Sequence, residues 1–533
     1  MNFDIISYQF YRALKGIWLD ISDYVIGDVN GFMGIPGYGP MDRIAARGTI
    51  HFTLKNTDNA FTPNHINCIL GFEKGTKFKL VITHNGLSST LFYGTIEDIL
   101  PEKIGLHWYT HVTAYDYIYK LATHDLQLPA YTTNKSIDEA VPLVIANMPI
   151  APISTDYNAG QDTFPYIFDS MQDKTIALQE LAKLAHSELG YIYIKHGAAA
   201  DEILVVDGRY TRTAEDIKEV PVLDDINLAL EDGNLLALED GTELILDTYT
   251  EDVEFTSDNT AIGMESGRYY YNEVKTKVYP RKIDAAATSV LFNLEHYITI
   301  SAGETVTITG RFRDPDQEAV SVAGLDMVTP VATIDYLMNT ASDGSGSDIT
   351  ADLTVTVTYG ANGAEYELTN NNASVGYVTK LQARGKGVYI YRPVEYGAEY
   401  STGINADGRQ TLYLDMKYQN NPLAGESFAE NILDIYSQKR LVISGLEYYP
   451  NRNNTLASAF MFCSVGDRIH VAENDTNQEN DFIIHSIDFK IIPKGVVACR
   501  YGLMSESLLP ASDFWRLGTV GKSELGVTTK LGF

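Results

Sequence analysis

Apolar and polar residues alternate with a period of two over most of the chain. The alternation is clear at 49–54, 77–82, 305–309 and 353–357. Two Asn-Gly dipeptides, at 85–86 and 362–363, stand beside such runs and favour tight hairpin turns. The pattern predicts a mainly β protein, with an antiparallel barrel or sandwich in residues 17–125 and a second β region from 272 to 401.

Helical spacing interrupts this pattern in three places. Between Thr175 and Leu189 apolar residues recur every three or four positions, and Gly190 follows as a stop signal. Residues 136–139 have the form of a capping box, although Pro142 implies a kink or a later start. A last helix is expected at 427–439. Four short strands are also expected, at 191–194, 203–209, 444–449 and 481–492.

A short duplication occupies residues 228–246, where Leu-Ala-Leu-Glu-Asp-Gly occurs twice with a period of eight. Two copies are too few for a solenoid, so we expect paired strands of a hairpin. Calcium binding by the Glu-Asp-Gly turns is the more specific, functional alternative. One acidic pair per turn supplies fewer oxygens than the six to eight that calcium takes, so the hairpin is favoured.

The charge balance is strongly acidic: 40 Lys and Arg against 70 Asp and Glu give a net charge of −30. Such a surface repels phosphates and disfavours a basic nucleic-acid groove. Solubility or a saline habitat is the plainer explanation. Cys68, Cys463 and Cys499 lie far apart, so neither disulfides nor a zinc site is indicated. With no signal peptide and no long apolar run, we expect a soluble protein that folds in a reducing compartment.

Known catalytic and nucleotide-binding motifs do not occur in the sequence. His107 and His111 share a strand face about 13 Å apart, which is too far for joint metal ligation. His84, His124 and His186 adjoin apolar runs and are predicted to be packing or surface residues. Tyr269, Tyr270 and Tyr271, after Arg268, could stack on bases or sugars, but a half-buried strand explains them equally well.

One carboxylate cluster stands out, formed by Asp314, Asp316 and Glu318 around Pro315. It could supply the acid and base of a glycosidase or ligands for calcium. A solvated turn is the favoured interpretation, because 70 acidic residues produce such clusters by chance. We therefore predict no catalytic, cofactor-binding or metal-binding residue.

The order of several segments resembles the tail-tip hub proteins of long-tailed bacteriophages. The matching segments are 17–25, 92–99, 188–194, 205–209, 271–281, 301–305, 312–315, 407–415, 465–471 and 482–487. The clearest are the helix, glycine and hairpin that end at Arg209, and the strand Asn272 to Arg281. The resemblance spans roughly residues 15–510.

The resemblance implies a fold with two tail-tube-like split β-barrels and two smaller helix-bearing domains, mainly β with α+β insertions. The barrels would lie near 15–125 and 275–510. The units expected on this basis are an N-terminal barrel at 1–125, a helix-strand-strand domain at 126–212, a β-hairpin linker at 213–271, a β domain of the second barrel at 272–400, an α+β segment completing it at 401–510, and a C-terminal extension at 511–533.

The resemblance also implies a function: a non-enzymatic baseplate hub, forming a homotrimeric, pseudo-hexameric ring in the virion tail tip and assembled in the host cytoplasm. Expected partners are the distal tail or tail tube protein, the tape measure protein, and tip or fibre proteins, with residues 514–533 at a neighbour contact. DNA would pass through an acidic channel, and we expect no attached hydrolase or receptor-binding domain. The alternatives are a carbohydrate-active enzyme using Asp314 and Asp316, or a glycan-binding module.

Overall fold

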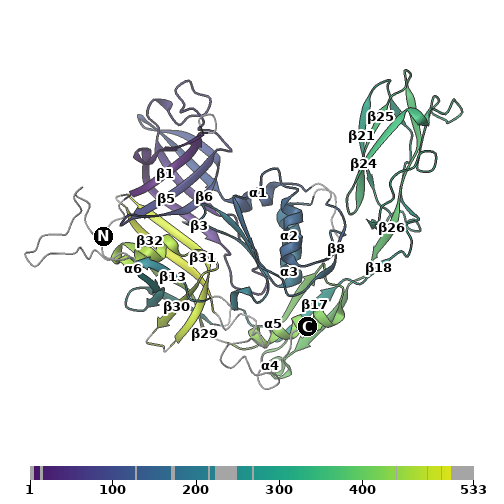
Figure 1. Cartoon of the computed structure of the whole chain (residues 1–533). Coiled ribbons are helices and arrows are strands. Elements are labelled where there is room, and N and C mark those ends of the chain that lie inside the picture. The colour runs from purple at the N-terminus through teal and green to yellow at the C-terminus, as the bar shows by residue number, and fades with distance from the viewer. Residues whose placement is uncertain are drawn as a thin grey trace, which may run out of the picture.

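The computed structural model describes residues 5–12, 16–126, 129–169, 175–197, 199–213, 216–222, 249–266, 269–439, 441–473, 475–476, 478–493 and 495–505. The duplication at 228–246, Arg268 and the segment 514–533 lie outside the described residues. The chain is mainly β, as the alternation predicts. Figure 1 shows a crescent, in which two arms of β-structure are joined through a helix-bearing middle.

Seven strands at the N-terminal end form one run, in the order β3-β4-β7-β6-β5-β1-β2. They are β1 Ile5–Arg12, β2 Ile17–Asp20, β3 Val25–Gly34, β4 Thr49–Lys55, β5 Lys77–His84, β6 Leu87–Ile104 and β7 His107–Tyr115. In β4, Ile50, Phe52 and Leu54 are buried while His51 and Lys55 are exposed, so the period of two reflects one packed face. The outer strands β2 and β3 are consecutive in sequence, so the run curls into a split barrel.

Six further strands form a second run in the order β16-β29-β32-β31-β30-β15. They are β15 Glu254–Thr256, β16 Ala261–Ser266, β29 Leu441–Tyr448, β30 Arg468–Glu473, β31 Gln478–Ile492 and β32 Val496–Ser505. Here too the outer strands, β15 and β16, are consecutive in sequence. The helix α6 Asn454–Phe462 and the hairpin of β13 Glu219–Val222 with β14 Tyr249–Asp252 lie beside this second split barrel (Figure 1).

The middle of the crescent holds three helices and small sheets. Its elements are α1 Tyr117–Thr123, β8 Thr132–Lys135, α2 Ile137–Ile145, β9 Ser154–Tyr157, β10 Phe164–Ile167, α3 Ala177–Glu188, β11 Tyr191–Lys195 and β12 Ile203–Asp207. The capping box of Ser136 and Glu139 is present, and α2 begins directly after Ser136, with Pro142 inside the helix. α3 ends at Glu188, and its C-cap is the left-handed Leu189 (φ 59°), one residue before the predicted Gly190.

Residues 273–278 and 394–436 contribute a second layer beside the middle. The central strand β17 Glu273–Val278 pairs with β27 Val394–Glu399 on one side and with β28 Thr411–Met416 on the other, and α5 Pro422–Tyr436 packs on β17 and β27. The short α4 Ser401–Asp407 precedes β28. The predicted helix at 427–439 begins earlier, because Asn421 caps it and Pro422 takes the first turn.

The second arm is a separate β-sandwich, which we call the outer sandwich (residues 281–390). Its strands are β18 Arg281–Ile283, β19 Ser289–Asn293, β20 Ile298–Ile300, β21 Thr305–Arg311, β22 Ala323–Leu325, β23 Tyr336–Asn339, β24 Leu353–Tyr359, β25 Gly363–Asn370 and β26 Gly376–Ile390. It has its own apolar core, whereas both barrels and the middle share one. A buried ion pair between Arg281 and Asp169 fastens it to the middle.

The strand pairing differs from the expected second barrel at 275–510. The described strands of 272–400 pair among themselves and with β28, while the second split barrel takes its strands from 254–266 and 441–505. Alternation identifies a strand and its buried face, but it carries no information about the partner strand. The boundaries at 272 and 401 therefore do not delimit the second barrel.

Candidate assembly surfaces

One strand, β31, belongs to both barrels. Its first part pairs with β30, and residues 486–491 pair with β3 of the N-terminal barrel, which makes one 13-stranded sheet from the described strands. The Phe489 ring lies directly on Gly31, where an added Cβ would come within 2.1 Å of ring carbon Cζ. The strand shifts register at His485, so a β-bulge marks the passage from one barrel to the other.

His485 extends from this bulge into a fully buried polar cluster. Its Nδ1 lies 2.8 Å from the Gly37 carbonyl oxygen, which can only accept, so Nδ1 carries the proton. Its Nε2 therefore accepts from Nη1 of Arg212, at 2.8 Å. Burial and the nearby Arg212 charge lower the pKa of His485 to about 3, so the ring is neutral.

Arg212 is the cation of this cluster and comes from the middle of the crescent. Its Nε donates to Oδ2 of Asp207 at 3.0 Å, and both side chains are completely buried. The guanidinium carbon lies 3.8 Å from the ring centre of Tyr191 and 4.7 Å from that of Tyr193. The cluster thus connects the N-terminal barrel, the middle and the second barrel at one point.

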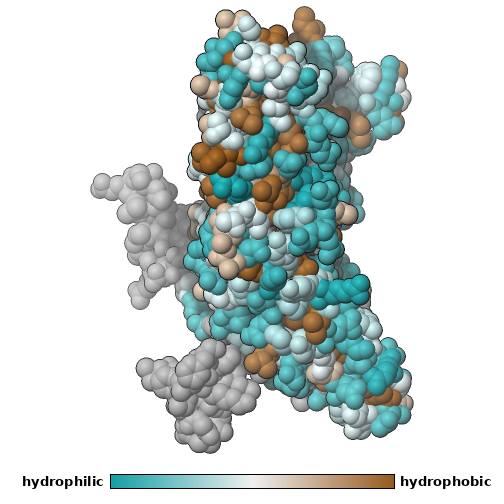
Figure 2. Space-filling model, turned by 90° about the vertical axis from the view of Figure 1, so that its right-hand side faces the viewer, coloured by the Kyte–Doolittle hydropathy of each residue, from teal (hydrophilic) through white to brown (hydrophobic). Residues whose placement is uncertain are grey.

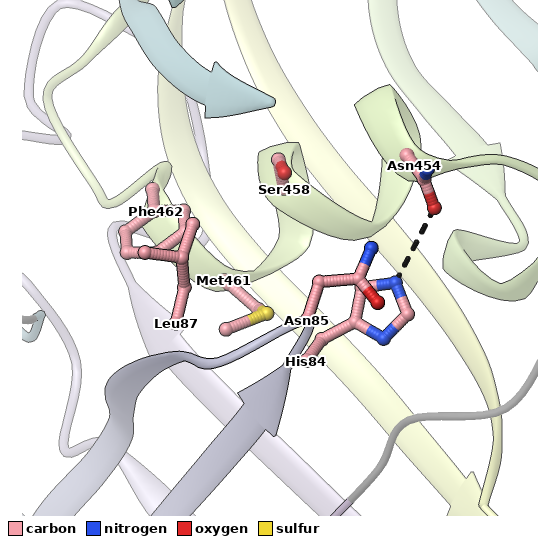
Figure 3. A pocket seen from close by; sticks show the side chains of 7 residues that line it. All are labelled: His84, Asn85, Leu87, Asn454, Ser458, Met461 and Phe462. Carbon is pink, nitrogen blue, oxygen red and sulfur yellow. Dashed lines mark hydrogen bonds between the residues drawn. The ribbon is translucent and has the colours of Figure 1, made fainter. Parts of the chain in front are cut away.

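A second contact between the barrels lies at the β5–β6 turn (Figure 3). His84, Asn85 and Leu87 of this turn face α6, and Nε2 of His84 lies 3.4 Å from Oδ1 of Asn454. The space between them has no room for a water molecule. It is a packed joint, and His84 is a packing residue as predicted.

The two runs match strand by strand. β3-β4-β7-β6-β5 corresponds to β16-β29-β32-β31-β30, with antiparallel pairing at each step. One register shift coincides, since β6 shifts between Ile96 and Asp98 where β31 shifts at His485. The other shifts differ: the extra residues lie on β3 in the first run but on β29 in the second, and the shift between β5 and β6 has no counterpart between β30 and β31. The correspondence ends at the outer strands, since β1 is antiparallel to β5 but β15 is parallel to β30. The barrels are therefore an internal duplication.

The duplication identifies two edges that lack the partner found elsewhere in the chain. β31 meets β3 along residues 486–491, but the matching part of β6, residues 98–103, pairs with β7 alone among the described strands. Likewise β3 has two partners, while its counterpart β16 pairs with β29 alone among the described strands. In the part of the chain that the structure describes, one half of the same joint is thus left open at each end.

Exposure along these edges agrees with a missing neighbour. At the matched positions of β6, Ile99 and Pro101 are only half-buried and Lys103 is exposed. The corresponding β31 residues, Ile487, Phe489 and Ile491, lie under β3 and are buried. Pro101 removes one donor from the β6 edge. When the two runs are aligned by register, Pro101 of β6 corresponds to Phe489 of β31, which lies opposite Gly31 of β3. Gly31 itself has no counterpart in β16.

The solvent face of the 13-stranded sheet carries charges of both signs. Exposed residues on it include Glu447, Asp488, Arg500 and Lys490, and the last forms an ion pair with Asp28 at 2.7 Å. Acidic and basic side chains therefore both occur on this face.

The candidate catalytic residues lie at separate places in the fold, apart from Asp314 and Glu318. The Asp316 amide donates to Oδ1 of Asp314, as in an ordinary turn, and only Asp314 and Glu318 of the three line a groove. His111 contacts Glu102 and Thr53, whereas His124 and His186 bond to the carbonyls of Asn147 and Met41. Within the described ranges, no group of three or more His, Cys, Asp or Glu is arranged to hold a metal ion.

The described helices are all too short or too polar to span a membrane.

Comparisons with known proteins give structural neighbours only. No family model and no curated protein matches the sequence. Among solved structures, the chain is similar to a tail protein of Neisseria meningitidis MC58, with 9% identity, 95% and 98% of the two chains covered and a TM-score of 0.46. It is also similar to the prophage MuSo2 43 kDa tail protein of Shewanella oneidensis (10%, 95% and 99%, 0.45) and to prophage tail protein gp18 of Listeria monocytogenes (7%, 94% and 95%, 0.38). All three are tail proteins, two of them from prophages.

Proposed function

We propose that the chain is a structural, non-enzymatic hub of a bacteriophage tail tip. In this role copies associate head to tail into a ring, through a repeat of the joint that each chain already contains. The observation that carries the proposal is the internal duplication with one unused half-joint at each end. The contact joins two different surfaces of the chain and is therefore heterologous. Copies add head to tail until the rotation from one copy to the next closes the ring.

The internal joint specifies the contact between copies at residue level. Within the chain, Phe32 of β3 lies opposite Asp488 of β31. Aligning the matched registers equates Phe32 with Met264 and Asp488 with Leu100. In the ring, β16 of one copy therefore pairs antiparallel with residues 98–103 of the next, with Met264 opposite Leu100. This pairing covers two strand edges that would otherwise promote uncontrolled association.

Three copies would place six similar barrels in the ring, which suits a junction between a six-fold tube and a three-fold tip. The number of three copies comes from the resemblance to hub proteins. The same resemblance implies the partner proteins, namely a distal tail or tube protein, the tape measure protein, and tip or fibre proteins. It also implies a virion tail that is assembled in the host cytoplasm. DNA would pass through the ring during ejection. If the sheet's solvent face lines the channel, its mixed charges give a wall without the basic excess that retains phosphates.

A designed disulfide tests the ring. Directly opposed residues of antiparallel strands have Cα atoms about 4.5–5.5 Å apart, within disulfide range. The variant Met264→Cys with Leu100→Cys, in a Cys68→Ser background, should form covalent dimers and trimers on oxidation. The native Cys463 and Cys499 are buried and should stay inert.

The matched control keeps Met264→Cys but pairs it with Leu106→Cys, at the more exposed hairpin tip beyond the paired stretch. Non-reducing gels and native mass spectrometry should show cross-linked species for the first pair and few for the second. Equal cross-linking by both pairs, or a monomer at every concentration, would refute the proposed joint.

A further inference from the structure

The segment 56–76, which connects β4 to β5 in the N-terminal barrel, carries a strongly exposed apolar residue. Ile66 is 96% exposed, more than any other large apolar side chain among the described residues, and Leu70 is 52% exposed. Single exposed apolar residues are common, as Figure 2 shows for the face of the outer sandwich, so exposure alone does not identify a contact. What distinguishes Ile66 is its position in the duplicated barrels.

The segment 56–76 is braced by its own side chains. Asn56 is buried, and its side-chain oxygen accepts from the Phe61 amide at 2.9 Å. Next to Ile66, Nδ2 of Asn67 donates to the carbonyl oxygen of Asp58 at 3.0 Å. These hydrogen bonds hold Ile66 in place before any partner arrives, which reduces the entropy lost when a partner covers it.

The second barrel contains a counterpart of this segment, the connection 449–467 between β29 and β30. Each connection begins with a 3-10 helix, η2 Thr57–Asn59 in the first and η5 Pro450–Arg452 in the second. The second connection then forms α6, whereas the first continues as the loop that carries Ile66.

The two connections also end alike. The Gly75 amide donates to the Ile96 carbonyl at 2.6 Å, and the Gly466 amide donates to the Ile484 carbonyl at 2.7 Å. Both glycines have a positive φ, of 87° and 91°. Ile96 and Ile484 each directly precede the register shift that the two barrels share. The connections 56–76 and 449–467 are therefore equivalent parts of the duplicated barrels.

The second connection takes part in the joint within the chain. Its helix α6 lies against the β5–β6 turn of the N-terminal barrel, where Ser458 and Met461 are buried (Figure 3). If the ring repeats this joint, segment 56–76 of one copy takes the place of α6. The β30–β31 turn of the next copy then takes the place of the β5–β6 turn.

Both of these parts lie beside the strand edges that the ring would join. Nζ of Lys74, in the first connection, lies 3.7 Å from Oε2 of Glu97, directly before residues 98–103 of β6. In the β30–β31 turn, Oγ1 of Thr476 lies 3.9 Å from Sδ of Met264 on β16. Pairing of β6 with β16 would therefore bring the segment and the turn to the same side of the joint.

We propose that residues 64–70 of one copy pack on the β30–β31 turn of the neighbouring copy, with Ile66 as the central apolar contact. This inference rests on the proposed ring. Nδ1 of His65 accepts from the Asn67 amide at 3.1 Å, so Nε2 carries the proton of the neutral ring. That proton suits the exposed carboxylate of Asp475 in the turn.

A short bis-maleimide cross-linker tests the contact in the full-length chain. The variant Ile66→Cys with Thr476→Cys, in a Cys68→Ser background, should give covalent dimers and trimers on denaturing gels. The matched control pairs Ile66→Cys with Ile150→Cys, an exposed residue in the middle of the crescent, and should give few.

A second pair of variants measures the energetic role of Ile66. Ile66→Asp should weaken self-association about tenfold in analytical ultracentrifugation, the effect expected from one isoleucine side chain that the contact buries. Ile150→Asp should leave self-association unchanged.

The disulfide designed at positions 264 and 100 separates this contact from the ring. Equal cross-linking by both maleimide pairs, or no effect of Ile66→Asp while that disulfide still forms, overturns the contact and leaves the ring intact. If that disulfide does not form either, the ring itself is refuted and the contact with it.

Discussion

Replacing Arg212 with methionine should loosen the junction of the two barrels more than any nearby surface change. The substitution keeps much of the side-chain volume but removes the hydrogen bonds to Asp207 and His485. Hydrogen bonds to charged groups contribute about 1.5–3 kcal/mol each. Asp207 would then remain as a buried carboxylate, and breaking a buried pair in this way costs about 3–5 kcal/mol.

A double variant distinguishes charge from packing. Asp207→Asn with Arg212→Met removes the buried, unpaired carboxylate charge. In the native chain the Tyr193 hydroxyl donates to Asp207 at 2.9 Å, and the asparagine oxygen can still accept this hydrogen bond. We expect the double variant to recover at least about 2 kcal/mol relative to Arg212→Met alone, because replacing both partners of a buried pair is often close to neutral.

Urea unfolding measures both variants. Trp18 and Trp108 lie in the N-terminal barrel, so in a Trp515→Phe background the fluorescence transition reports on the unit that the cluster supports. Arg500→Met, on the exposed face of β32, is the matched surface control and should barely shift the midpoint. A loss below about 1 kcal/mol for Arg212→Met, or a double variant no more stable than it, would refute the assigned role of the ion pair.

Two further predictions concern buried groups. Burial raises the pKa of Asp116 to about 7 and that of Glu202 to about 8, so the folded chain holds protons that the unfolded chain releases. Their contribution is complete below about pH 4 and is lost as pH rises toward 8. Glu202→Gln should therefore lose less stability than the native chain between pH 5 and 8 in urea titrations, and an identical slope would contradict this. Gly31→Ala should cost about 1–3 kcal/mol by displacing the Phe489 ring, and Phe489→Leu in the same chain should restore part of it. Failure of that rescue in thermal unfolding would exclude the steric cause.

Local structure was predictable wherever the signal lay in neighbouring residues. The strands at 49–54 and 353–357, the Ser136 capping box and the helix ending near Leu189 all follow from spacing or side-chain chemistry. The helix α6 was missed because its residues are apolar on most sides, which hides helical periodicity. Asn453, whose side chain caps it, was the available signal.

The assembly surfaces could not be derived in the same way. His485 and Arg212 come from distant segments, and nothing in the neighbouring sequence of either indicates the other. The duplication is equally hidden, because it lies in pairing order and register shifts, whereas Leu100 and Asp488 at matched positions differ in polarity. The resemblance to hub proteins indicated two barrels, but it placed the second one over residues that form other sheets.

The sharing of β31 between barrels constrains when the chain can mature during synthesis. His485 and Gly37 are 448 positions apart, which corresponds to about 22–90 seconds of translation at about 5–20 residues per second. Throughout that interval β3 lacks its second neighbour, and the strands that complete the second barrel do not yet exist. A ribosome product that stops before residue 486 would carry a β3 paired with β4 alone and would lack the strands that complete the second barrel. The joint between the two barrels therefore forms only in chains that are translated beyond this point.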